Sequence, residues 1–147
     1  MNWKEVKTIS DVEHLNELFS VFHESYLKEL CFFSGSYVGE DLKMHLRKEL
    51  TARLVFQRTC DVSSAVELKF RDVIQINITP ASEYEFAFIM EAPLHMVDDN
   101  FYWNSNDFPI HDDRKNDFTW ILAKQVFWRV REDLLGDKQV YLSDSVD

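Results

Sequence analysis

The sequence predicts an α+β fold in which an N-terminal helix packs on a strongly curved antiparallel sheet, or on a partly open barrel, of six to seven strands. Near the amino terminus, apolar residues recur at helical spacing, whereas most of the remaining chain alternates apolar and polar residues with a period of two. The chain has 147 residues, which is the size of one domain. We therefore expect residues 1–147 to form a single domain.

The helix is expected over residues 11–22. Ser10 and Glu13 match a capping box, in which each side chain binds a backbone N–H group at the start of the helix. One stripe of apolar residues follows at helical spacing and would face the sheet: Val12, Leu15, Leu18, Phe19 and Phe22.

Strands are expected wherever apolar and polar residues alternate. These stretches are residues 26–33, 50–57, 66–71, 74–79 and 83–96, and Pro93 indicates an edge or a bulge near the end of the last one. Residues 118–131 fit both periods, but their β-branched and aromatic content favours a strand, with a helical turn over 131–135. Residues 38–48 and 98–117 are expected to be loops. Such alternation is typical of an antiparallel sheet with one face open to water.

The charge balance narrows the classes of partner. The chain has 16 basic and 26 acidic residues, which gives a formal net charge of -10. This charge repels nucleic-acid phosphates and anionic lipids, so we expect no nucleic acid and no membrane as a partner. It would attract a basic protein, although negative charge also serves solubility alone. Since no apolar h-region opens the chain, the cytoplasm is the expected location.

Motifs for catalysis and cofactor binding are missing from the sequence. Glycine-rich phosphate loops, CxxC pairs and HExxH are absent, so we expect no cofactor, no metal and no assigned catalytic residue. Cys31 and Cys60 lie in or beside apolar stretches and are expected to be buried thiols. The sequence does not decide whether they form a disulfide, because it does not give the distance between them.

His23 and Glu24 form one candidate site. A histidine beside a carboxylate can act as a general base or bind a metal. His23 is also predicted to lie where the helix ends, and there an imidazole can satisfy unpaired carbonyl groups and the helix dipole.

A second candidate site is the acidic and aromatic loop. Its candidate binding residues are Asp98, Asp99, Tyr102, Trp103, Asp112 and Asp113. Tyrosine and tryptophan within an acidic loop are typical of a protein-binding surface. Three other interpretations stay open: ordinary turn residues, a site for a hard divalent cation, and aromatic residues of the core.

Several short motifs resemble an uncharacterised family of small bacterial cytosolic proteins. These motifs are His23-Glu24-Ser25 with Lys28-Glu29-Leu30, then Ser34-Gly35 and Val38, the stretches 54–58 and 66–70, the pair Tyr102-Trp103, and Ala123-Lys124 with Trp128-Arg129. Glu24 stands where the family pattern has an aspartate. The resemblance spans residues 22–130 and implies no activity and no catalytic residue.

The functional hypothesis that follows is a non-enzymatic protein-binding module, of the kind represented by immunity proteins that inhibit a basic partner. The acidic charge, the acidic aromatic loop and the missing catalytic motifs favour it. The alternatives are a hydrolase or a metal-binding protein built on His23 and Glu24, and a protein that binds a small ligand inside the curled sheet.

Overall fold

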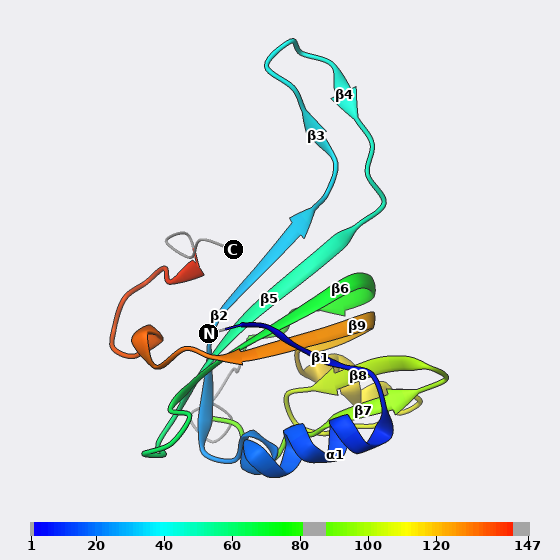
Figure 1. Ribbon diagram of the computed structural model, residues 1–147. Helices are drawn as coiled ribbons and strands as arrows, with labels where there is room; N and C mark the ends of the chain where they lie inside the picture. Colours follow the sequence, from blue (N-terminus) through cyan, green and yellow to red (C-terminus); the bar gives the residue numbers. More distant parts are fainter. Residues whose placement is uncertain (1, 81–87, 143–147) are drawn as a thin grey trace.

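The computed structural model describes residues 2–80 and 88–142, and it confirms the α+β fold (Figure 1). Among these residues, seven strands form one sheet in the order β2-β5-β6-β9-β8-β7, and β1 pairs with β9 beside β8. The sheet does not close into a barrel. None of the described helices has the length and apolarity that crossing a membrane requires.

The bounds of the elements are as follows. The sheet contains β1 (Lys4–Val6), β2 (Ser25–Ser34), β5 (Leu50–Arg58), β6 (Ala65–Asn77), β7 (Leu94–Val97), β8 (Asn100–Asn104) and β9 (Trp120–Val130). A separate two-stranded ribbon contains β3 (Tyr37–Val38) and β4 (Met44–His45). Within residues 2–80 and 88–142, the helices are α1 (Ile9–Leu18) and three short 3-10 turns, η1 (Ser20–Phe22), η3 (Asp113–Asp117) and η4 (Glu132–Leu134).

The helix begins two residues earlier than the sequence predicts. Thr8 is the N-cap: its hydroxyl accepts a hydrogen bond from the N–H of Asp11, and the Asp11 carboxylate accepts bonds from the N–H groups of Lys7 and Thr8. The prediction that Ser10 and Glu13 form the capping box is therefore wrong. Aspartate can replace the usual Glu or Gln because the extended backbone at Thr8 brings the two N–H groups within its reach.

Helix α1 ends at Leu18 because the backbone that follows is left-handed. Ser20, Val21 and Phe22 have φ of 49°, 49° and 60°, a conformation that costs about 1–2 kcal/mol for each non-glycine residue. Aromatic packing offsets this cost. Phe19 meets Trp128 edge to face at 5.2 Å between ring centroids, and the centroid of Phe22 lies 4.6 Å from that of Phe56. The predicted helix over 11–22 is thus an α-helix followed by a tight turn.

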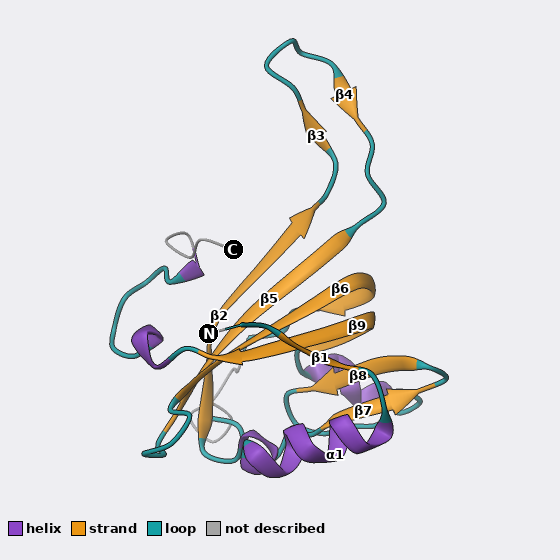
Figure 2. Cartoon of the chain, viewed as in Figure 1, coloured by secondary structure: helices purple, strands orange, loops and turns teal. Residues whose placement is uncertain are grey.

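The core lies between α1 and the concave face of the sheet (Figure 2). It contains the predicted helical residues Val12, Leu15, Phe19 and Phe22, but Leu18 is exposed. From the sheet it takes the alternate residues Ala52, Leu54, Phe56, Val66, Leu68 and Phe70. The period-two alternation of the sequence therefore identified the buried face of β5 and of the first half of β6.

Residues 66–79 were predicted as two strands, but 65–77 form one strand, β6. Its register with β9 shifts between Val73 and Gln75, and Asp72, just before this shift, has a φ of 52°. Such a β-bulge moves the side-chain alternation by one residue. Val73 is therefore buried and Ile74 is half exposed, contrary to the predicted apolar face of Ile74, Ile76 and Ile78.

The segment from Glu83 to Met96 is not one long strand where it is described. Residues 81–87 lie outside the described residues, Ile89 makes an isolated bridge to Ser25, and β7 follows Pro93. The loop predicted over 98–117 is also partly wrong, since Phe101, Tyr102 and Trp103 belong to β8. The strand over 118–131 and the turn after it are confirmed by β9 and η4.

The sequence predicted that the second face of the sheet is open to water, but part of this face is covered. Leu134, Tyr141 and Leu142 cover Val55 and Ala65 and form a smaller cluster there, with Cys31 packed against it. Beside this cluster, the fully buried Glu67 lies among three arginines, Arg53, Arg129 and Arg131.

Both cysteines are free thiols. Cys31 is half-buried and Cys60 is exposed, so the prediction of buried thiols is wrong for Cys60. Cys60 lies in the connection between β5 and β6.

Candidate functional site

His23 and Glu24 follow the left-handed turn and lie at the surface. The Nδ1–H of His23 donates to the carbonyl of Met90 at 2.7 Å, and its Nε2 is 3.9 Å from the nearest Glu24 oxygen. Their side chains are 48% and 63% exposed. The hydroxyl of the neighbouring Ser25 donates to the Phe22 carbonyl. The histidine therefore binds Met90 rather than the end of α1, and the hydrolase hypothesis stays a prediction.

Asp98 and Asp99 form the turn between β7 and β8. Val97 pairs with Asn100, so these two aspartates make a two-residue hairpin loop. Their φ angles of 49° and 64° match a type I′ turn, where aspartate is tolerated because its short side chain can bind the local backbone. Both side chains are exposed and form a small acidic tip.

Asp112 and Asp113 lie at the start of η3, and Asp112 has a local role. Its carboxylate accepts hydrogen bonds from the backbone N–H of Arg114 at 2.9 Å and from its guanidinium at 2.6 Å. These bonds lower the pKa of Asp112 to about 2. Its charge is thus compensated by Arg114, whereas Asp113 is exposed.

Tyr102 and Trp103 are buried, so neither side chain contributes to an exposed binding surface. The Tyr102 hydroxyl donates to the carbonyl of Phe108 at 2.6 Å, and the Trp103 indole N–H donates to the carbonyl of Ala92 at 2.8 Å. Burial raises the pKa of Tyr102. Of the alternatives that the sequence left open for this pair, the structure supports the aromatic core.

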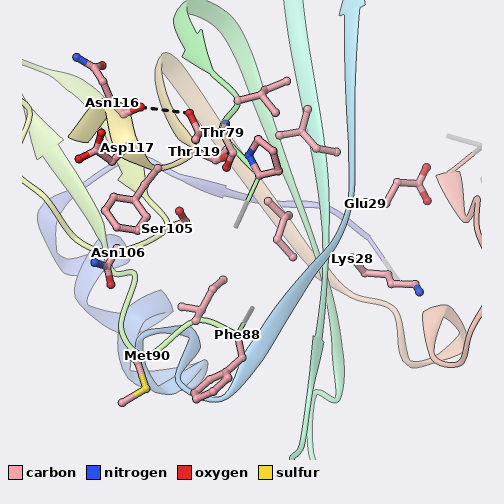
Figure 3. A pocket seen from close by; sticks show the side chains of 16 residues that line it. Lys28, Glu29, Thr79, Phe88, Met90, Ser105, Asn106, Asn116, Asp117 and Thr119 are labelled. Atoms are coloured by element: carbon pink, nitrogen blue, oxygen red, sulfur yellow. Dashed lines mark hydrogen bonds between the residues drawn. The ribbon is translucent and has the colours of Figure 1, made fainter. Parts of the chain in front are cut away.

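A cavity of about 690 Å³ lies between the edge strand β2 and the loops after β6 and β8 (Figure 3). Its lining includes the apolar residues Leu27, Leu30, Ile78, Phe88, Ile89 and Phe118. Lys28 and Glu29 point away from the cavity, while Thr79 bonds to the carbonyl of Asn116 at 3.2 Å. The cavity thus brings little titratable chemistry together, and ligand binding there stays a prediction.

Metal-binding and nucleophilic groups are sparse in the part of the chain that the structure describes. No cluster of three or more histidine, cysteine, aspartate or glutamate residues within 2–80 and 88–142 could hold a metal ion. Burial, reinforced by Glu29, raises the pKa of Cys31 to about 11, so its thiol is protonated at neutral pH.

The feature that sequence reasoning missed is an arm formed by residues 37–46, which contains β3 and β4. It projects well beyond the rest of the molecule, as Figure 1 shows at the top. Four of its apolar side chains lie in water with more than half of their surface exposed: Val38, Leu42, Met44 and Leu46. The alternation of Leu42, Met44 and Leu46 with Lys43 and His45 is the signal in the sequence, although the residues 38–48 that contain it are predicted as a loop.

The arm is held in place at its base. Tyr37 stacks on His45 at 4.6 Å, and the guanidinium of Arg47 lies 5.2 Å from the Tyr37 ring centroid. The hydroxyl of Ser36 donates to the carbonyl of Arg47 at 2.9 Å and accepts from its N–H at 3.0 Å. A two-stranded ribbon is marginal alone in water, and these contacts supply part of what it lacks.

Comparison of the chain with protein-family models, with curated proteins and with solved structures finds no match. The resemblance to a bacterial family therefore stays a prediction, and the function is argued from the geometry of the described residues.

Proposed function

We propose that the protein is a non-enzymatic protein-binding module that docks to its partner through the arm of residues 37–46. The observation that carries this proposal is the exposed apolar surface of the arm, where Leu42, Met44 and Leu46 are 84%, 88% and 87% exposed. Contiguous exposed apolar surface on a projecting element is typical of a protein-interaction site.

Leu42 adopts a backbone conformation that is unfavourable for leucine. It lies in the turn between β3 and β4 with a φ of 65°, where glycine or asparagine is favoured over a branched apolar residue. The leucine costs about 1–2 kcal/mol of backbone strain and buries little surface in return. A bound partner would supply the missing burial.

The charge around Leu42 fits a basic partner. Glu40 and Asp41 precede it and Lys43 follows it, all of them exposed, so the tip presents an apolar side chain beside two carboxylates and one ammonium group. An apolar pocket with a basic rim would complement this tip, and the net charge of -10 would steer a basic protein toward it. An immunity-type inhibitor of a basic protein is the class of function we propose.

Substitution at the tip tests the proposal. Leu42→Asn removes the apolar contact while relieving the strain, so we expect unchanged or higher thermal stability together with at least tenfold less captured partner. The measurement compares proteins captured by the wild type and by the variant from a native lysate, at low and at high salt, by quantitative mass spectrometry. The captured basic protein should also decrease as salt increases.

Two matched variants separate the arm from the acidic turn. Val62→Asn changes another exposed apolar residue, which lies in the β5–β6 loop at the opposite end of β5, and should leave capture unchanged. Asp98→Lys with Asp99→Lys tests whether the β7–β8 turn contributes. Capture that is unaffected by Leu42→Asn combined with Met44→Asn would rule out the arm as the docking element.

A further inference from the structure

Strand β2 lies at one edge of the sheet, beside the base of the arm (Figure 1). Among residues 2–80 and 88–142, it pairs with β5 on one side, and its other side meets only the isolated bridge between Ser25 and Ile89. A strand edge with unpaired N–H and C=O groups is a template on which another strand can form.

The ladder with β5 identifies the backbone groups that face outward. The N–H of Gly35 donates to the carbonyl of Glu49 at 2.8 Å, directly beyond the last pair of β2 with β5. In an antiparallel ladder only alternate residues bond the neighbouring strand. The N–H and C=O groups of Leu30, Phe32 and Ser34 therefore point away from β5.

The two halves of this edge differ in their protection against pairing. The first half carries Lys28 within a β-bulge, and both features discourage the addition of a strand. The second half, residues 30–34, contains neither a charge nor a proline, and its register with β5 is regular. Phe32 and Phe33 lie on its opposite faces and are 45% and 47% exposed. An apolar edge of this kind calls for a cover.

The opposite edge of the sheet, β7, is already closed at Leu94. The side-chain amide of Asn16 donates to the Leu94 carbonyl at 2.9 Å, and its oxygen accepts from the Leu94 N–H at 2.8 Å. The two edges are therefore not equivalent, and the counterpart that suits the edge of β2 is β2 of a second copy. Such pairing about a twofold axis stops at two copies, whereas pairing of unlike edges builds a filament.

We infer that residues 30–34 of β2 pair antiparallel with the same residues of a second copy, about a twofold axis at Phe32. Phe32 then lies opposite its own counterpart, and Leu30 lies opposite Ser34. No charged residue enters these pairs, which matters for a chain with a net charge of -10, because like charges at opposite positions destabilise a sheet. The inference is independent of the arm.

Sedimentation equilibrium of the full chain over about 5–500 μM measures the pairing. Five paired residues form a small interface, so we expect a dimer with a dissociation constant of about 10–100 μM. Because both copies are acidic, the dimer should tighten as salt increases. Capture of a basic protein by the arm should weaken with salt, so the two proposals can fail separately. A chain that stays monomeric at about 500 μM at low and at high salt would overturn the inference.

Ser34→Pro and Ser34→Ala form a matched pair of variants for the edge. Both lose the hydrogen bond that the Ser34 hydroxyl accepts from the Ser36 N–H, but only proline removes the outward N–H of residue 34. We expect dimerisation at least tenfold weaker in Ser34→Pro and changed less than about twofold in Ser34→Ala. Circular dichroism checks that both variants fold. Equal effects of the two substitutions would contradict pairing through this edge.

Phe32→Lys tests the position of the axis, because it places two ammonium groups opposite each other. The control is Ile74→Lys on the central strand β6, where the apolar side chain is 48% exposed. Phe32→Lys should weaken the dimer at least tenfold, and the control should leave its affinity within about twofold. A dimer that tolerates Phe32→Lys would show that the two copies meet elsewhere.

Discussion

At the scale of single residues, Glu67 is the most constrained charge in the described structure. It is fully buried, and its carboxylate accepts hydrogen bonds from Arg53 at 2.8 Å and from Arg129 at 2.6 Å, with Arg131 at 3.7 Å. Each arginine is itself largely buried. A buried ion pair contributes little net stability, but removal of one partner leaves an uncompensated charge in the interior.

Glu67→Gln should therefore lower the free energy of unfolding by about 3–5 kcal/mol, because Arg53 and Arg129 would stay charged and buried. Urea unfolding followed by tryptophan fluorescence measures the change. The control is Glu49→Gln, whose exposed carboxylate pairs with Arg71 at 3.4 Å and should cost about 1 kcal/mol or less. Similar losses in the two variants would contradict the role assigned to Glu67.

At the scale of elements, α1 depends on the carboxylate of Asp11. Backbone N–H groups of Lys7 and Thr8 bind this carboxylate and lower the pKa of Asp11 below its usual value. A carboxyl group with a lowered pKa in the folded state stabilises the fold above its unfolded pKa, near 3.9. This contribution is lost as the pH falls through the lower, folded value.

The difference in stability between the wild type and Asp11→Asn should therefore be constant at neutral pH and shrink below about pH 3.9. Urea unfolding at a series of pH values measures it. Glu13→Gln is the matched control, because Glu13 follows Asp11 in α1 but takes no part in the capping box. A pH-independent difference for Asp11→Asn, or an equal effect of Glu13→Gln, would show that the cap does not depend on the Asp11 charge.

At the scale of the whole molecule, the arm and the body of the sheet are separable. The buried core contains no residue of the arm, and the hydrogen bond from Gly35 N–H to the Glu49 carbonyl at 2.8 Å closes the sheet below it. Figure 2 shows the ribbon beyond this point without another element against it. The fold of the body therefore does not require the arm.

Replacement of residues 36–48 by Asn-Gly should leave the body folded, with a free energy of unfolding within about 1 kcal/mol of the wild type. A two-residue turn suits the hairpin that Gly35 and Glu49 close, and a shorter loop costs less entropy. Thermal unfolding by circular dichroism measures stability, and the shortened protein should no longer capture the partner. A body that does not fold would show that the arm is part of the structure rather than a docking element.

The period-two alternation predicted most of the sheet because a strand with one buried face must alternate. It failed in β6 after Phe70, where Asp72 has a positive φ and a bulge follows between Val73 and Gln75, because neither feature shows in the apolar pattern of the sequence. It also failed at Tyr102 and Trp103, because the preceding run of aspartates is typical of loops. From the sequence alone, aromatic residues that stand beside aspartates fit a binding surface and the core equally well.

The sequence by itself determined the α+β class, the helix and its buried stripe, the antiparallel strands β2, β5 and β9, and the acidic net charge. These depend on local periodicity and composition. Only the tertiary structure decided which side chains are exposed on the arm, that Glu67 lies among three arginines, and that β2 pairs with β5 at the edge of the sheet. These contacts join residues far apart in the chain, and register and burial, rather than local pattern, bring them together.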